Sequence, residues 1–192
     1  HCTFLNDANA GAFAEGIGSD LPSSFFYLSL SNTVGGAIFH DSNLLPGDAF
    51  RCGEAGHMTL IPDGKPCYCG KTGCVDAYCS ARLLSDLSGG RLEDFFLGLQ
   101  QNNPDYRSVW DTYLKHLAVV INNLHMLLDY DIVLGGYVGS FLTPWLDTIR
   151  HLVAERNTFE DDGSFVKLCT YQIGAAAYGA AMDVMEGFLR TV

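Results

Sequence analysis

The sequence C-G-E-A-G-H-M-T-L-I-P-D-G-K-P-C-Y-C-G-K-T-G-C-V-D-A-Y-C-S, residues 52–80, holds five of the seven cysteines of the chain. Within it, His57, Cys67, Cys69 and Cys74 follow the spacing His-x9-Cys-x-Cys-x4-Cys. A structural zinc ion takes four nitrogen and sulfur ligands in a tetrahedron, and three cysteines with one histidine form a common set. Glycines between the ligands permit the sharp turns that would aim them at one point. We therefore predict a zinc loop over residues 52–80; the alternative is a turn-rich loop of buried, unpaired cysteines.

The same stretch resembles the signature of a known protein family. Residues 53–57 (G-E-A-G-H) and 67–76 (C-Y-C-G-K-T-G-C-V-D) are similar to the E-x-G-H and C-x-C-G-x-x-G-C-x-E pattern of the ROK family, which comprises repressors, uncharacterised reading frames and sugar kinases. The one departure is Asp76, because the family has Glu at that place. The resemblance extends over essentially the whole chain, so residues 1–192 are expected to form one ROK C-terminal domain.

The resemblance implies an α/β architecture, the actin-like ATPase (ribonuclease H-like) fold, with a mixed sheet flanked by helices and a zinc loop. Apolar residues at alternating steps of four and three, from Trp110 to Leu128, independently predict one long helix. Strands are expected near 25–30, 35–40, 131–134 and 165–169, with further strand character at 2–5 and 44–51. Helices are expected at 8–15, 75–87, 92–101, 104–128, 140–156 and 173–189, the last one rich in small residues that permit close approach to another element.

The resemblance also implies a sugar site. Asn6 and Asp7 would hold the 3- and 4-hydroxyl side of a hexose, with Asp7 as the catalytic base, while Glu54, His57 and Asp76 would hold the 1- and 2-hydroxyl side. Carboxylates suit this task because each accepts hydrogen bonds from two neighbouring hydroxyls. If zinc takes one ring nitrogen of the histidine, the other must carry the proton and can donate to the sugar. Helix capping is an additional role for the Asn-Asp pair.

Two glycine pairs are candidates for nucleotide contacts. Gly35 and Gly36 lie in a loop that could bring backbone N–H groups close to phosphate, although a hairpin with a glycine bulge has the same appearance. Gly135 and Gly136 follow a buried strand and precede a helix, a form shared by nucleotide-contact turns and many other α/β turns. In ROK kinases the first loop resembles G-T-G-x-G-G-G. Here residues 31–33 are Ser-Asn-Thr, so side chains stand where bare backbone meets the γ-phosphate.

Composition excludes several classes of protein. The formal net charge of −11 and the pI near 4.7 would repel a phosphate backbone, so this segment itself is not expected to contact nucleic acid. No apolar run approaches the length of a membrane span. An odd number of cysteines, three of them spaced as ligands, favours a reducing cytoplasm over a disulfide framework. The remaining cysteines, Cys2, Cys52, Cys79 and Cys169, are predicted to be small buried apolar residues.

Two functions follow from the resemblance. The first is the sugar-binding half of an ATP-dependent kinase acting on a hexose or N-acetylated hexose, with ATP and Mg²⁺ as cofactors beside the structural zinc. The second is the sugar-sensing effector domain of a ROK transcriptional repressor. ROK kinases carry a D-x-G-G-T phosphate loop in an N-terminal half, and no such loop occurs here, so the sequence indicates a C-terminal part of a longer protein or a truncated gene product. We expect no useful kinase activity from this chain alone, and a homo-oligomer in which the final helix is covered. A mononuclear zinc enzyme with three ligands is the alternative to a structural metal.

Overall fold

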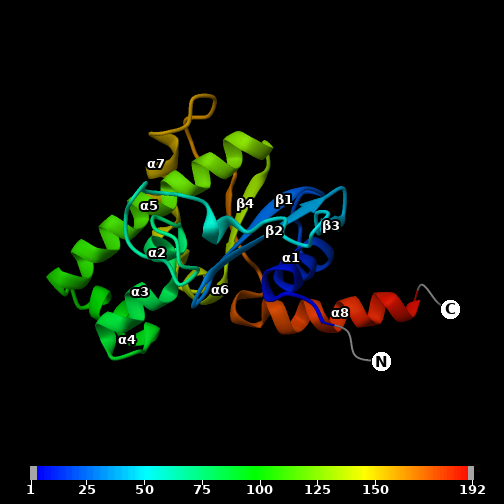
Figure 1. Ribbon diagram of the computed structural model, residues 1–192, viewed down its shortest axis with the longest axis horizontal. Coiled ribbons are helices and arrows are strands. Elements are labelled where there is room, and N and C mark those ends of the chain that lie inside the picture. The colour runs from blue at the N-terminus through cyan, green and yellow to red at the C-terminus, as the bar shows by residue number, and fades with distance from the viewer. Residues whose placement is uncertain (1–3, 190–192) are drawn as a thin grey trace.

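A five-stranded mixed sheet lies between two layers of helices (Figure 1). The computed structural model describes residues 4–189. The strand order is β3-β2-β1-β4-β5; β1, β2 and β3 are antiparallel neighbours, whereas β4 runs parallel to both β1 and β5. The strands are β1 (Phe25–Leu30), β2 (Val34–His40), β3 (Asn43–Leu45), β4 (Asp131–Gly135) and β5 (Val166–Leu168).

The helices divide between the two faces of this sheet. Helices α1 and α8 pack together on one face, and the long α5 lies on the other with α7 and the shorter helices (Figure 1). The helices are α1 (Asp7–Gly18), α2 (Asp76–Cys79), α3 (Ala81–Ser85), α4 (Leu92–Gln100), α5 (Pro104–Leu128), α6 (Gly136–Gly139), α7 (Leu146–Ala154) and α8 (Ala175–Leu189). Single 3₁₀ turns occur at Ala55–His57, Asp86–Ser88, Thr143–Trp145 and Gln172–Gly174.

Strand β1 explains the two layers, because all of its residues are buried. Phe25 and Tyr27 belong to the smaller core beneath α1 and α8. Phe26, Leu28 and Leu30 belong to the larger core with α5. Successive side chains of a strand point to opposite faces, so a central strand covered on both sides has no polar alternation. The apolar run of the sequence, interrupted by Ser29, is therefore the sign of its central place.

Helix α5 matches its prediction in both limits. Asn103 caps it, accepting hydrogen bonds from the N–H groups of Asp105 and Tyr106, and Pro104 occupies the first turn, where its missing N–H has no partner to lose. Its apolar stripe packs into the larger core.

The small residues of α8 permit the close approach to another element that the sequence predicts. A Cβ atom on Gly179 would lie 1.7 Å from the carbonyl oxygen of Ala10, so α1 and α8 approach almost backbone to backbone.

Several predicted elements are wrong. Phe4 and Leu5 are not in a strand, and the first three residues, Cys2 included, lie outside the described part. The strand predicted to reach residue 51 ends at Leu45, because Pro46 has no N–H to donate to a ladder. The helix predicted for residues 140–156 begins only at Leu146, since Pro144 interrupts it within a 3₁₀ turn.

The helix predicted for residues 75–87 is also broken. Ser80 is extended, with ψ of 153°, and separates α2 from α3. At this break the N–H of Ala81 donates to the carbonyl oxygen of Ser31 over 2.7 Å instead of to its own helix. The segment that follows the metal loop is thereby fixed to the β1–β2 turn. Cys79 and Cys169 are buried as predicted, whereas Cys52 is partly exposed, because it lies in the loop that leaves β3.

Candidate sugar and metal site

The first part of the site is the N-terminus of α1. The Oδ1 atom of Asn6 accepts hydrogen bonds from the N–H groups of Ala8 and Asn9, at 3.0 and 3.3 Å, which confirms its capping role. Asp7 is exposed, and its Oδ1 accepts from the N–H of Ala8 at 2.9 Å. The helix begins beside the carboxyl ends of β1 and β4, the end of a parallel sheet at which ligands of α/β proteins bind. The carboxylate therefore faces a pocket.

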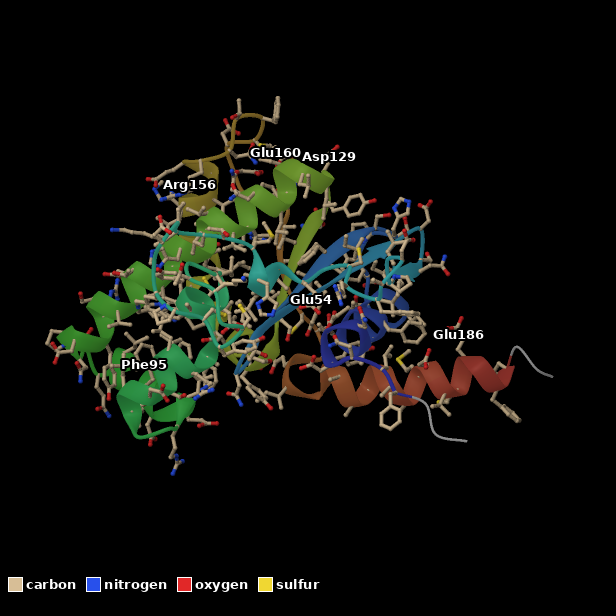
Figure 2. The ribbon with its side chains drawn as sticks, in the orientation of Figure 1. Glu54, Phe95, Asp129, Arg156, Glu160 and Glu186 are labelled. Carbon is tan, nitrogen blue, oxygen red and sulfur yellow. The ribbon has the colours of Figure 1, made fainter. Side chains whose placement is uncertain are left out.

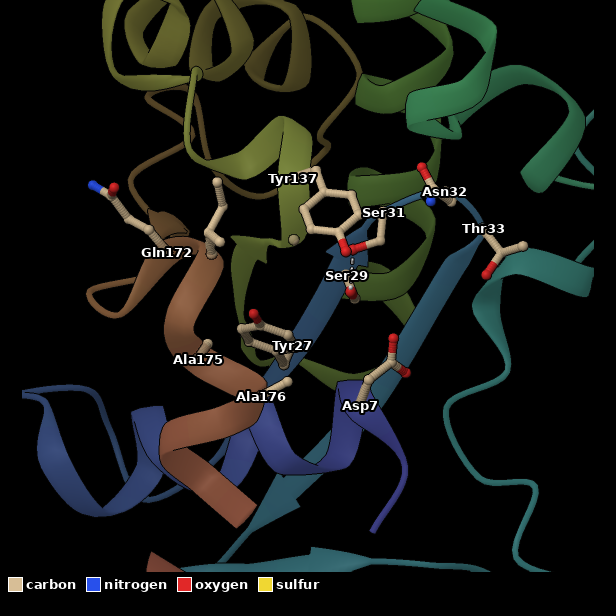
Figure 3. Close-up of a pocket in the computed structure, with 12 residues that line it drawn as sticks. Asp7, Tyr27, Ser29, Ser31, Asn32, Thr33, Tyr137, Gln172, Ala175 and Ala176 are labelled. Carbon is tan, nitrogen blue, oxygen red and sulfur yellow. Dashed lines mark hydrogen bonds between the residues drawn. The ribbon is translucent and has the colours of Figure 1, made fainter. Parts of the chain in front are cut away.

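That pocket has a volume of about 230 Å³ and a wall of mixed polar and apolar character (Figure 3). Asp7 stands on one side, and the start of α8 and the residues after β4 stand on the other. Between them, the hydroxyl oxygens of Ser29 and Ser31 lie 3.3 Å apart. The lining residues are Asp7, Tyr27, Ser29, Ser31, Asn32, Thr33, Gly136, Tyr137, Gln172, Ile173, Ala175 and Ala176.

The first glycine pair lies within a strand rather than in a loop, which corrects the sequence prediction. Gly35 and Gly36 belong to β2 and are in register with Ser29 and Leu28. A Cβ on Gly36 would lie 2.6 Å from the carbonyl oxygen of Gly53 and 2.5 Å from the Phe26 ring. Close packing against the loop that enters the metal segment therefore explains this glycine without a phosphate. The turn itself consists of residues 31–33, whose side chains line the pocket.

The second glycine pair follows β4, as predicted, and meets an aromatic residue that the sequence analysis missed. Gly136 has a φ of +76°, in the region that favours glycine. A Cβ on Gly135 would lie 2.1 Å from the hydroxyl oxygen of Tyr27. Burial raises the pKa of Tyr27 well above its usual value, and the carboxylates of Glu15 and Asp7 act in the same direction, so it stays a neutral phenol at the pocket floor. The only sequence signal for it is a tyrosine between Phe25 and Ser29 on the α1-facing side of β1.

The second part of the site is the metal loop, residues 57–74, in which the four predicted ligands come together. One ligand atom from each of His57, Cys67, Cys69 and Cys74 can be chosen so that all lie within 4.8 Å of one another. The Sγ atoms of Cys69 and Cys74 are 3.7 Å apart. A tetrahedron with metal–sulfur bonds of about 2.3 Å has sulfur–sulfur edges of about 3.8 Å, so the residues present fit a zinc ion.

Backbone turns hold these ligands in place. The N–H of Cys67 donates to the carbonyl of Lys71 over 2.8 Å, and the N–H of Gly70 returns to the carbonyl of Cys67 over 3.0 Å. Gly70 and Gly73 have φ values of +84° and +79°. At Gly73 a Cβ would also collide with the carbonyl oxygen of Ile61, at 1.9 Å. These two glycines are thus required by the conformation of the loop.

The thiols of the group differ in acidity. The backbone N–H of Lys71 lowers the pKa of Cys69, which is exposed. Burial raises the pKa of Cys74 to about 12. A thiol with a raised pKa ionises when a cation stabilises the thiolate, and cysteine binds metals as the thiolate. The support for a metal site comes from the geometry of the four ligand atoms, and the two thiols differ in how readily each forms a thiolate.

The two remaining carboxylates flank this loop. Glu54 is exposed and directly precedes the 3₁₀ turn that carries His57. It lies near the middle of the view in Figure 2, whereas Asp129 and Glu160 lie at the C-terminal end of α5. Asp76 is only 7% exposed and begins α2; its Oδ1 accepts a hydrogen bond from the N–H of Val34 over 2.6 Å. One predicted sugar contact is thus already engaged by the backbone of β2. Asn6 is similarly engaged by its helix.

The comparisons with known proteins agree with this arrangement. A sequence profile of the ROK family matches residues 1–186. The chain belongs to the ROK family. An N-acetylmannosamine kinase of Vibrio cholerae is 31% identical over 144 residues, which are 71% of this chain and 50% of the relative. The chain spans about half the length of the curated relatives it matches.

Solved ROK structures share the fold. The ROK hexokinase of Thermus thermophilus superposes with a TM-score of 0.73 at 24% identity, over 95% of this chain and 65% of that one. A ROK family transcriptional regulator, a homologue of the Escherichia coli MLC protein, superposes with a TM-score of 0.71 at 22% identity, over 92% of this chain and 51% of that one. The fold is therefore that of the actin-like ATPases, and the chain resembles the hexose-binding half of ROK sugar kinases. No helix within residues 4–189 is long and apolar enough to cross a membrane.

Proposed function

We propose that this chain is the sugar-binding part of a ROK protein and that its ligand is a hexose or an N-acetylated hexose. Asn6 and Asp7 contact one side of the ring, and Glu54, His57 and Asp76 contact the other. The observation that carries the proposal is that His57 is both a candidate metal ligand and a neighbour of Glu54 in the same turn. It belongs both to the segment that holds Glu54 and to the metal-ligand group, so one loop fixes the carboxylate and the imidazole together.

In this proposal zinc is structural and is held by His57, Cys67, Cys69 and Cys74. When bound, the ion ties the two ends of the loop and leaves no open coordination position, so it activates no water. The ring nitrogen that does not face the metal keeps its proton and donates to a sugar hydroxyl. The N-acetylmannosamine kinases among the relatives support an N-acetylated hexose as ligand. The shorter Asp76, held back by Val34, leaves room for a substituent larger than a hydroxyl at C2.

As a kinase, the complete protein would use Asp7 as general base toward the attacking sugar hydroxyl, and ATP and Mg²⁺ would bind at the adjoining pocket. Gly136, which lines this pocket, is the main proposed nucleotide contact. Gly35, Gly36 and Gly135 are proposed contacts on the family resemblance alone. The pocket beside Asp7 supports this role, because it leads from the carboxylate to Gly136. Phosphoryl transfer depends on positioned donors, and we propose that this chain alone supplies too few of them for useful turnover.

A specific observation favours the second candidate, a sugar-sensing effector domain of a transcriptional regulator. Ser31, Asn32 and Thr33 turn between β1 and β2 with side chains where a phosphate-binding turn presents bare backbone. A sensor needs the sugar site and the metal loop but no phosphate cradle. We place either form in the cytoplasm as a homo-oligomer, with residues 1–192 as one domain that makes no nucleic-acid contact itself.

Titration calorimetry of the zinc-loaded chain with glucose and N-acetylmannosamine tests the proposal. We expect saturable binding with one site, lost in His57→Ala and weakened at least about tenfold in Asp7→Ala, since each removes a hydrogen bond to a charged or polarised group. His151→Ala is the matched control, because that histidine is 75% exposed on α7 and pairs only with its neighbour Glu155. Absence of binding to every hexose would overturn the proposal. ATP turnover measured with the same sugars separates the kinase from the sensor.

A further inference from the structure

The metal loop carries an aromatic residue that neither the metal nor the proposed sugar contacts account for. Tyr68 lies between two of the cysteine ligands, and its side chain is 65% exposed. Its hydroxyl oxygen is 3.2 Å from the Nε2 atom of His57. The two rings are tilted by 60°, with centroids 5.4 Å apart, so the contact is a hydrogen bond at the ring edge rather than a stack.

The partner of this phenol belongs to the proposed sugar site. Tyr68 follows Cys67 in the chain, and the histidine that its hydroxyl contacts is one of the residues proposed to hold the 1- and 2-hydroxyl side of the ring. The phenol hydroxyl therefore lies beside a nitrogen that a sugar hydroxyl would also contact.

The contact also gives the two ring nitrogens of His57 different partners. Because Nε2 faces the phenol, Nδ1 remains for the metal. An imidazole with a metal on one nitrogen carries its proton on the other, so Nε2–H donates and the oxygen of Tyr68 accepts. A sugar hydroxyl would need the same N–H. The hydroxyl of Tyr68 and a sugar hydroxyl therefore compete for the same donor.

We propose that Tyr68 lowers the affinity of the sugar site by occupying His57 Nε2 until a sugar displaces it. This inference rests on the proposed function. A mostly exposed ring held by one hydrogen bond can rotate away without opening the core, so displacement requires little beyond the loss of that bond. The affinity of a site whose competent state is only partly populated falls by that fraction. A sugar hydroxyl that accepts a hydrogen bond from Nε2–H compensates for the lost bond to Tyr68.

Replacement of the hydroxyl alone tests the idea. Tyr68→Phe keeps the ring and removes the competitor, so glucose and N-acetylmannosamine should bind about two- to tenfold more tightly, as expected for one net hydrogen bond. The same variant of ¹⁵N-histidine-labelled, zinc-loaded protein should shift the Nε2–H resonance of His57 before any sugar is added. Tyr178→Phe is the control, because that phenol is 51% exposed on α8 and stacks on Tyr171 instead.

The outcomes separate this inference from the proposed function. Wild-type protein that binds sugar while Tyr68→Phe binds with unchanged or weaker affinity overturns the inference alone; weaker binding would make the phenol a sugar contact. An unmoved His57 resonance in Tyr68→Phe overturns it as well, without any sugar. If neither protein binds any hexose, the proposed function fails and the inference fails with it. Equal zinc content in both proteins, measured by atomic emission, is required for each comparison.

Discussion

The Oδ1 atom of Asp76 accepts a hydrogen bond of 2.6 Å from the backbone N–H of Val34, in a buried position. The bond joins the first residue of α2, directly after the metal loop, to the first residue of β2. The hydrogen bond from Ala81 N–H to the Ser31 carbonyl makes a second connection between the same two segments. The loop that gathers the sulfurs and the turn that lines the pocket are therefore positioned relative to each other by a carboxylate and a backbone break.

Removal of this carboxylate should destabilise the fold. Asp76→Ala leaves the buried N–H of Val34 without a partner, and we expect the free energy of unfolding to fall by about 1–3 kcal/mol. Asp76→Asn keeps an acceptor and should lose less. Urea unfolding followed by tryptophan fluorescence measures both. Asp111→Ala is the control, because that carboxylate is 51% exposed and makes only a surface pair with Arg107. Equal losses at positions 76 and 111 would contradict a structural role for the Asp76 bond.

Removal of one sulfur should empty the metal loop. Cys74 is buried beside Cys69, so Cys74→Ala deprives a closed site of one of four ligands, and we expect zinc affinity to fall by more than about tenfold. The melting temperature should fall toward that of the chelator-treated wild type, because ligand binding to the folded state stabilises it. Zinc content and thermal unfolding are the measurements. Cys52→Ala, at a partly exposed cysteine outside the group, should retain its zinc and its melting temperature.

Elements that depend on local pattern could be predicted from the sequence, and elements that depend on distant contacts could not. Strand β1 and helix α5 have their predicted limits, since an apolar run and a stripe of period 3.6 specify them. The break at Ser80 depends on the carbonyl of Ser31, almost fifty residues earlier. Likewise, position 36 must be a glycine because the backbone near Gly53 passes over it. Neither contact has a counterpart in the neighbouring sequence.

The residues of the site also differ in whether local sequence pattern or distant contacts position them. Ligand spacing was sufficient to predict that His57 and the three cysteines come together, because four metal-binding side chains on a turn-rich loop have few other arrangements. Tyr27 and Tyr68 were missed, since a single tyrosine has no spacing to recognise. Both act through a hydroxyl whose partners, near Gly135 and at His57, are brought to it by the tertiary fold.

His116 should make the stability of the protein depend on pH. It lies on α5 with its ring edge-on to Tyr78, at a centroid distance of 5.0 Å. Burial lowers the pKa of His116, and the charge of Lys65 lowers it further. The folded protein thus binds a proton less readily than the unfolded chain. This contribution is present above the unfolded pKa of about 6.5 and is lost as the pH falls from that value through the lower folded pKa.

The test compares urea unfolding at pH 7.5 and pH 5.5. His116→Gln should reduce the loss of stability between the two by about half a kcal/mol or less, since solvent screens a half-buried ring. His151→Gln is the control and should leave the loss unchanged, because that side chain is exposed on α7. A His116→Gln profile parallel to the wild type would show that the ring has the same proton affinity in both states.

Two glycines of α8 should respond in opposite directions to the same substitution. Gly179 faces α1, and its added Cβ would lie 1.7 Å from the carbonyl oxygen of Ala10; Gly187 has nothing within 4 Å. Gly179→Ala must separate the two helices and should lower the free energy of unfolding by about 1–3 kcal/mol. Gly187→Ala gains helix propensity without a contact and should raise it by about 0.5–1 kcal/mol.

Thermal and urea unfolding of both variants measure these changes. A higher free energy of unfolding in both variants would mean that α1 and α8 do not pack as described. The consequence reaches the site, because α1 begins at Asp7 and α8 begins at Ala175, on opposite walls of the same pocket. Separation of the helices at Gly179 moves one wall relative to the other. Gly179→Ala should therefore weaken sugar binding as well as stability, whereas Gly187→Ala should change stability alone.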